Sequence, residues 1–242
     1  MSGPELSIVL PVFDEAAVLE ATFAELIPTL EALGRSFEVV AVDDGSRDDS
    51  KAILERLAAD EPRLRVFALP ENRGKGAAVK RGMLEATGAA IVFMDADLST
   101  PLEELPRFLG ALDSGHQVVI GNRRSPGSKI TRRQPWIRET LGKGFTLLTR
   151  TLLVPGVHDF TCGFKAFEKE AAREIFARST QAGWAFDAEL VVIASLRGYR
   201  LAQVPVTWRH EDGTKVRLLT AVFGSLRELL AIKWRALRGA YR

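Results

Sequence analysis

The sequence predicts an α/β fold in which helices cover both faces of a mostly parallel sheet. Two observations lead to this prediction. Short, continuous apolar runs alternate along the first half of the chain with segments whose apolar residues recur at helical spacing. Acidic or basic clusters directly follow several of these runs, which is typical of the carboxyl ends of parallel strands, where such folds bind ligands.

The predicted elements alternate regularly. In chain order they are strand 6–12, helix 16–33, strand 37–42, helix 48–59, strand 64–69, helix 77–86, strand 90–94, helix 101–112 and strand 117–120. The apolar runs lack polar alternation, which favours strands buried on both faces. Gly34 and Gly88 follow the first and third helices and Pro101 opens the fourth, which are the usual places for these residues at helix ends.

Beyond residue 125 the alternation weakens and basic residues become more frequent. We therefore expect one domain over residues 1–242, with a soft division into residues 1–125, 126–215 and 216–242. The last of these segments is expected to be an amphipathic helix.

Composition limits the class of protein. Hydrophobic residues make up 46% and charged residues 26% of the chain, and the net charge is only +2, which excludes a disordered chain and a general polyanion binder. The single cysteine, Cys162, can form no disulfide within the chain. We see no signal peptide and no apolar stretch near the ~20 residues that span a bilayer. A cytoplasmic protein, dissolved or peripheral on the cytoplasmic face of a membrane, is expected.

Asp95 and Asp97 are two carboxylates that follow a predicted strand with one residue between them. In extended backbone both would point to the same side, and hard oxygen ligands suit Mg²⁺ or Mn²⁺. The alternative is that these acids are solvated or cap the helix that opens near Pro101.

Asp43 and Asp44 form a second acidic pair after a strand. Asp43 is suited to accept hydrogen bonds from a nucleotide base or ribose, whereas the alternative is a pair of acids in the first turn of a helix. With a later aspartate and a lysine, a phosphate-binding or receiver-like module is also conceivable, although it would occupy only about half of this chain.

The loop 72–76 (NRGKG) resembles a phosphate-binding loop, with Lys75 between two glycines. It matches neither the Walker A nor the dinucleotide-binding pattern. The following helix N-terminus would favour an anion, and a plain turn into a helix is the equal alternative.

Cations are dense after residue 122. Between residues 123 and 150 a single acid, Glu139, stands among Arg123, Arg124, Lys129, Arg132, Arg133, Arg138, Lys143 and Arg150. Apolar residues are interleaved with them at helical spacing, which indicates either a solvated helix face or an anionic membrane surface. Nucleic acid is not expected as a partner, because no recognised binding fold accompanies these cations.

The C-terminal segment shows the same pattern. Its apolar stripe consists of Leu219, Phe223, Leu226, Leu230, Trp234, Leu237 and Tyr241, and beside it lie Arg217, Arg227, Arg235, Arg238 and Arg242. The stripe could pack on the core. Because Glu228 is the only acid after Lys215, we favour a helix that lies in the plane of an anionic membrane.

Taken in order, eight short motifs resemble glycosyltransferase family 2, which has the GT-A fold. They are residues 11–15 (PVFDE), 42–46 (VDDGS), 72–76 (NRGKG), 95–97 (DAD), 121–123 (GNR), 159–165 (DFTCGFK), 184–189 (WAFDAE) and 211–215 (EDGTK). The series is similar to polyprenyl-phosphate sugar synthases, and most like dolichyl-phosphate β-glucosyltransferases.

The resemblance implies a role for each matching residue. Donor-binding residues would be Pro11, Phe13, Glu15, Asp43, Asp44, Lys75 and Asp95, with Asp95 and Asp97 holding Mg²⁺ or Mn²⁺. Catalytic residues would be Asp97, Arg123 and Asp187, and the acceptor would bind Arg123 and Lys215, to which the density of cations adds Arg132 and Arg133. Asp187 and Glu189 are suited to bind sugar hydroxyls, whereas the alternatives are first-turn acids of a helix and, for Lys215, a solvated lysine. The chain departs from the family at Phe13 and Asp14, where Tyr and Asn are frequent, and at Ser99, where mannosyl relatives often carry Gln.

The expected activity is inverting transfer of a hexose, with UDP-glucose favoured as donor, to a polyprenyl or dolichyl phosphate at a membrane surface. The first half would bind the donor and residues 126–215 the acceptor. Transfer from GDP-mannose, or to another acceptor, stays open. A sugar nucleotidyltransferase is less favoured because PVFDE is not a glycine-rich basic loop, and a non-enzymatic module would leave the basic second half without a role.

Overall fold

The computed structural model describes residues 3–132, 136–183, 185–209 and 218–242. The predicted mostly parallel sheet is confirmed: seven strands lie in the order β3-β2-β1-β4-β7-β5-β8. They are β1 (Leu6–Val12), β2 (Phe37–Asp43), β3 (Leu64–Ala68), β4 (Ala90–Phe93), β5 (Val118–Asn122), β7 (Lys165–Glu168) and β8 (Leu201–Pro205). A separate parallel pair joins β6 (Lys129–Arg132) to β9 (Thr207–Arg209).

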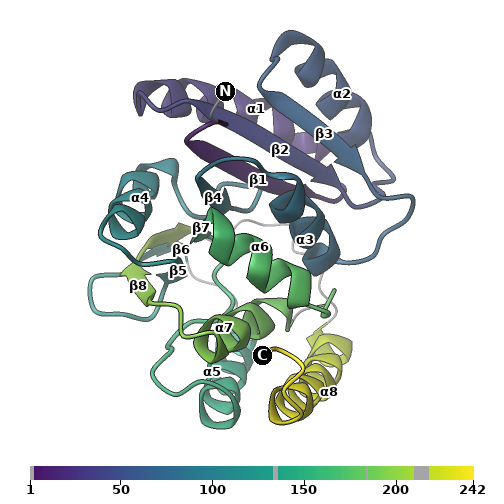
Figure 1. The fold of residues 1–242 in the computed structure, drawn as a ribbon. Coiled ribbons are helices and arrows are strands. Elements are labelled where there is room, and N and C mark those ends of the chain that lie inside the picture. Colours follow the sequence, from purple (N-terminus) through teal and green to yellow (C-terminus); the bar gives the residue numbers. More distant parts are fainter. Residues whose placement is uncertain (1–2, 133–135, 184, 210–217) are drawn as a thin grey trace.

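Helices cover both faces of the sheet, as Figure 1 shows. They are α1 (Ala16–Ala32), α2 (Ser50–Asp60), α3 (Lys75–Glu85), α4 (Leu105–Asp113), α5 (Trp136–Leu152), α6 (Lys169–Arg178), α7 (Phe186–Leu196) and α8 (Leu218–Leu237), with a 3-10 turn η1 (Leu102–Glu104) before α4. Most predicted boundaries differ from these by one to three residues, and the fourth helix begins four residues later than predicted because η1 precedes it. In the described part of the chain, no helix has the length and apolarity needed to cross a membrane.

The two faces carry separate apolar cores because side chains alternate along each strand. On β1, Val9 packs into one cluster with α3, α6 and α7, whereas Leu10 packs into the other with α1 and α4. Strands β4 and β5 are completely buried, and β1 is buried except at Pro11, which explains why their sequences are largely continuous apolar runs.

Strand β7 is the element that the sequence did not indicate. It runs antiparallel between β4 and β5, with Lys165 opposite both Phe93 and Ile120. The segment that precedes β7 therefore lies at the same sheet edge as the segments that follow β4 and β5. This arrangement adds residues 159–164 to the edge where the acidic and basic clusters were expected to meet.

A buried carboxylate joins the strands at the opposite end of the sheet, where β1 and β2 begin. Glu38 Oε1 accepts hydrogen bonds from the Ser7 hydroxyl at 2.7 Å and from the backbone N–H of Thr87 at 2.6 Å. Arg65 Nη1 lies 2.9 Å from the other oxygen. Burial opposes ionisation, but these donors outweigh it and hold the pKa of Glu38 below its ordinary value.

We predict that Glu38→Ala lowers the free energy of unfolding by about 2–3 kcal/mol, because the buried Ser7 hydroxyl and the partly buried N–H of Thr87 would lose their acceptor. Urea titration followed by circular dichroism measures this change. Glu25→Ala, at an exposed position of α1, is the control and should shift the midpoint little. Equal midpoints for the two variants would contradict the stabilising role of Glu38.

Candidate active site

Asp95 and Asp97 lie just beyond β4, at the carboxyl edge of the sheet. Asp97 Oδ1 accepts hydrogen bonds from the backbone N–H of Ser99 at 2.9 Å and from its hydroxyl at 2.6 Å. Asp97 thus shapes the turn before η1, yet burial and the charge of Asp95 together raise its pKa. Two crowded carboxylates of this kind favour binding of a cation.

Lys75 supplies one cation at this position. It is the first residue of α3, and its Nζ forms an ion pair with Asp95 Oδ1. Burial would lower the pKa of Lys75, but the charges of Asp95 and Asp187 outweigh that effect and raise it. Lys75 is therefore a protonated ammonium held against the acidic pair.

Asp44 fixes the loop that carries Lys75. Its two carboxylate oxygens accept the backbone N–H groups of Arg73 at 2.8 Å and Gly74 at 2.9 Å. Gly74 has φ of +96°, a conformation that favours glycine. The sequence placed Asp44 among donor-binding residues, and the structure gives it a contact with the loop beside the site.

The segment after β1 interlocks with the segment after β2. Asp14 Oδ1 accepts the N–H of Arg47 at 2.7 Å, and the N–H of Glu15 donates to the Ser50 hydroxyl at 2.8 Å. Asp43 is buried at the end of β2 and accepts the N–H of Ser46 at 3.2 Å. Pro11 and Phe13 are half-buried in the same region, so all four predicted base and ribose residues, Pro11, Phe13, Glu15 and Asp43, lie beyond or near the ends of neighbouring strands.

Arg123 follows β5 and is held by a buried aspartate. Its Nε lies 2.7 Å and its Nη2 2.9 Å from the two carboxylate oxygens of Asp159. Nη2 also donates to the Thr161 hydroxyl at 2.8 Å, and the guanidinium lies 5.3 Å from the ring centroid of Trp208. Although burial would raise it, the pKa of Asp159 is lowered to about 2 by Arg123.

Asp159 is a site residue to which the sequence reasoning assigned no role. The available signal was an acid among the apolar residues of the DFTCGFK motif, since a carboxylate buried there must be paired. Its partner could not be inferred, because the pair joins residues 36 positions apart.

Gly163 brings this segment onto the acidic pair. A Cβ atom at Gly163 would lie 2.0 Å from Asp95 Oδ2, so only glycine fits beside the carboxylate. Residues 159–163 thus contact Arg123 at one end and Asp95 at the other.

Asp187, which was predicted to be catalytic, lies in the first turn of α7 and forms an ion pair with the buried Lys165 of β7. Lys165 Nζ also donates to the carbonyl oxygen of Cys162 at 2.6 Å. Burial raises the pKa of Asp187, and the charges of Lys165 and Lys75 counteract this. Asp187 therefore contacts Lys165 and lies near enough to Lys75 and Asp95 for their charges to act on it.

The structure describes two of the four predicted acceptor residues. Arg123 lies at the edge described above, and Arg132 is exposed at the end of β6. Arg133 and Lys215 lie outside the described residues.

The donor set fits a divalent cation. Within the described ranges, no group of three or more His, Cys, Asp or Glu side chains could hold a metal by itself. Asp95 and Asp97 offer hard oxygen ligands, and Mg²⁺ or Mn²⁺ is commonly bound by one or two carboxylates with water and substrate phosphates as further ligands. A cation bound in this way would also offset the burial and the charge repulsion from Asp95 that together raise the pKa of Asp97.

The chain is similar to known glycosyltransferases in sequence. Residues 7–176 match the family model described as glycosyl transferase family 2. The chain is 32% identical to the glycosyltransferase AglD of Haloferax volcanii over 96% of its length but spans only 38% of that protein. It is 34% identical to dolichyl-phosphate β-glucosyltransferase ALG5C of Trichomonas vaginalis, covering 88% of this chain and 66% of the relative. The human dolichyl-phosphate β-glucosyltransferase is 31% identical, with 98% and 78% covered.

Among solved structures, the chain resembles glucosyl-3-phosphoglycerate synthase from Mycobacterium tuberculosis in complex with UDP. The TM-score is 0.69 at 24% identity, with 96% of this chain and 80% of that chain covered. The same synthase in complex with Mn²⁺ and UDP-glucose gives a TM-score of 0.68 at 23% identity, over 96% and 79% of the two chains. These likenesses show the fold, which is the GT-A fold that the resemblance implied.

We predict that Gly163→Ala weakens Mn²⁺ binding by about tenfold or more, the range typical of residues that support metal ligands, because the new methyl group would displace Asp95. Calorimetric titration with Mn²⁺ measures this effect. The matched control is Gly110→Ala in α4, where an added Cβ would meet nothing within 4 Å. Identical Mn²⁺ affinities for the wild type and Gly163→Ala would contradict the assignment of Asp95 as a ligand.

Proposed function

The chain belongs to glycosyltransferase family 2, and we propose that it transfers glucose from UDP-glucose to a polyprenyl phosphate with inversion at the sugar. Relatives named dolichyl-phosphate β-glucosyltransferase support the donor and the acceptor, because several are 31–34% identical to this chain over most of its length. Family membership makes the chain an enzyme, and the finer substrate assignment is the proposal.

One observation carries the proposal: two cations, Lys75 and Arg123, lie at the same sheet edge as an acidic pair. Lys75 pairs with Asp95, and Arg123 pairs with Asp159 of the segment 159–163, whose Gly163 lies against the Asp95 carboxylate. A nucleoside diphosphate needs this combination, because its negative charge grows as the bond to the sugar breaks. Asp95 and Asp97 would hold Mg²⁺ or Mn²⁺, and such an ion, when bound, supplies charge stabilisation to the leaving diphosphate.

Arg123 is suited to the same charge. Asp159 accepts hydrogen bonds from Nε and Nη2, and the Thr161 hydroxyl accepts another from Nη2, so the orientation of the guanidinium is fixed. The Coulombic effect of Asp159 keeps it protonated, and the pKa of Arg123 is raised despite burial. A prepositioned cation of this kind stabilises developing charge without reorganisation.

A phosphate monoester acceptor explains why no histidine is required near Asp97. Its second pKa is about 6, so it is mostly dianionic at pH 7 and is already nucleophilic. It needs cations that bind it. Arg132 is a candidate whose position the structure describes, and Arg133 and Lys215 are candidates from the sequence alone. The sugar would pass through an oxocarbenium-like state, as in other glycosyl transfers.

Helix α8 offers a surface for the membrane in which such an acceptor resides. Leu226, Leu230, Trp234 and Leu237 are 41%, 54%, 53% and 77% exposed. They form one stripe on the outer face, whereas Leu229 and Ile232 are buried on the inner face.

Cations border this stripe. The Arg238 guanidinium lies 3.9 Å from the ring centroid of Trp234. We place this face on an anionic cytoplasmic leaflet, which attracts basic residues and accepts apolar side chains. The sequence expectation that Tyr241 continues the stripe is wrong, because α8 ends at Leu237 and Tyr241 folds back into the core. Leu219 and Phe223 lie outside the described side chains.

The donor and acceptor are tested by incubating the protein with UDP-glucose, UDP-galactose or GDP-mannose and a polyprenyl phosphate in Mn²⁺. We predict lipid-linked glucose as the main product and little product when the polyprenol lacks its phosphate, because cations recognise that group. Faster transfer from GDP-mannose would contradict the proposed donor, and equal transfer to the free polyprenol would contradict the proposed acceptor.

Membrane binding is tested by co-sedimentation with vesicles. We predict that the protein binds anionic vesicles at low salt, that 0.5 M salt weakens binding because charges are then screened within about 5 Å, and that neutral vesicles bind poorly. Leu230→Glu with Leu237→Glu should abolish binding, whereas Leu196→Glu on α7, which is 41% exposed, should not. Retained binding of the double variant would exclude α8 as the membrane surface.

A further inference from the structure

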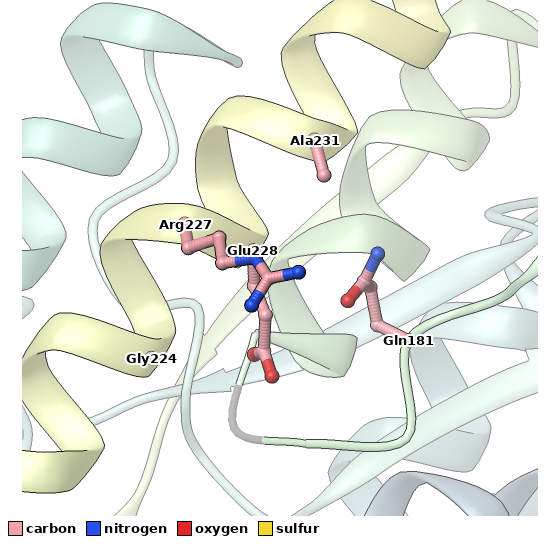
Figure 2. A pocket seen from close by; sticks show the side chains of 5 residues that line it. All are labelled: Gln181, Gly224, Arg227, Glu228 and Ala231. Carbon is pink, nitrogen blue, oxygen red and sulfur yellow. The ribbon is translucent and has the colours of Figure 1, made fainter.

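The C-terminal segment contacts a loop that reaches the donor side of the molecule. This loop joins α6 to α7 and comprises residues 179–185, described except for residue 184. Figure 2 shows Gln181 of the α6–α7 loop across a pocket from Arg227 and Glu228 of α8. Glu228 is the only acidic residue between positions 216 and 242.

Glu228 holds the end of the α6–α7 loop. Its Oε2 accepts the backbone N–H of Ala185, the N-cap residue of α7, at 2.8 Å. A Cβ atom at Gly183 would lie 2.2 Å from Oε1, so glycine leaves the space that the carboxylate occupies. The negative charge at a helix N-terminus is electrostatically favourable.

A second anchor holds the beginning of the same loop. The buried Glu189 accepts the N–H of Thr180 at 2.7 Å and the N–H of Gln181 at 2.8 Å. The Tyr241 hydroxyl donates to Glu189 at 2.6 Å. The loop is thus held at both ends by contacts that involve the C-terminal segment.

The middle of the loop packs on the two glycines that flank Lys75. The N–H of Gly76 donates to the Ala182 carbonyl at 3.0 Å. A Cβ atom at Gly74 would lie 2.6 Å from that oxygen, and one at Gly76 would lie 2.8 Å from the Gln181 carbonyl. The position of Lys75 therefore depends on the position of the α6–α7 loop.

We propose that Glu228 is a positioning residue for the donor site: by fixing the α6–α7 loop, it holds the Lys75 ammonium at Asp95. This inference rests on the proposed function, which places the donor diphosphate beside Lys75 and Asp95. It also connects the donor site to α8, whose opposite face carries the exposed apolar stripe. Donor binding and the position of α8 are consequently linked through the α6–α7 loop.

The first test is the affinity for UDP in Mn²⁺, measured by calorimetry. We expect Glu228→Ala to weaken UDP binding about tenfold, equivalent to about 1.4 kcal/mol. Glu228→Gln should retain most of the affinity, because its amide oxygen can still accept the Ala185 N–H. Arg227 lines the same pocket, so Arg227→Ala is the matched control and should leave the UDP affinity unchanged.

Steady-state kinetics separate positioning from general destabilisation. Glu228→Ala should raise the KM for UDP-glucose about tenfold and leave the KM for the polyprenyl phosphate unchanged, a split that loss of folded enzyme does not produce. If Glu228 acts through Lys75, then adding Glu228→Ala to Lys75→Ala should cause little further loss of UDP affinity. Should Glu228→Ala fail to fold, Gly183→Ala displaces the same carboxylate and should reproduce the donor effect.

The outcomes are distinguishable. Wild-type affinity in Glu228→Ala, or a loss that adds in full to that of Lys75→Ala, would overturn the inference while leaving the proposed function intact. A wild-type protein that binds no UDP in Mn²⁺ would overturn the proposed function itself.

Discussion

The ion pair between Lys75 and Asp95 is the interaction on which the other parts of the site depend. It joins the start of α3 to the end of β4, two elements that the sheet topology brings to one edge. Each neighbouring charge is balanced in a similar way, Asp159 by Arg123 and Asp187 by Lys165. Asp97 differs, because its hydrogen bonds come from the uncharged Ser99 and its pKa is raised. The edge therefore holds a local excess of negative charge, which suits a cation and the phosphates that accompany it.

Glycines allow these charges to approach one another. Gly163 leaves room for the Asp95 carboxylate, Gly74 and Gly76 leave room for carbonyl oxygens of the α6–α7 loop, and Gly183 leaves room for Glu228. Every one of these positions would be filled by a Cβ atom at less than 3.0 Å from a neighbour. The positions of Asp95, of the α6–α7 loop and of Glu228 therefore depend on close packing against backbone that carries no side chain.

Much of this arrangement could be predicted from the sequence, and the reasons are local. Apolar runs and the acids that follow them depend on short-range patterns, so the parallel strands and the edge at Asp43, Asp95 and Arg123 were predictable. Strand β7 was not, because four residues containing a buried lysine resemble no strand pattern. The partners of Arg123 and Asp187 were also not predictable, since these pairs join residues 36 and 22 positions apart. Tyr241 fits the helical stripe by spacing, but the helix ends before it and the Glu189 contact decides its position.

The central claim is that Asp95 and Asp97 bind a nucleoside diphosphate through a divalent cation. The most direct test is calorimetric titration of the protein with UDP, in Mn²⁺ and in EDTA, for the wild type and for Asp97→Asn. The account predicts that the wild type binds UDP in Mn²⁺ and loses most of that affinity in EDTA, and that Asp97→Asn binds weakly in both conditions. Equal UDP affinity of the wild type with and without Mn²⁺ would contradict it.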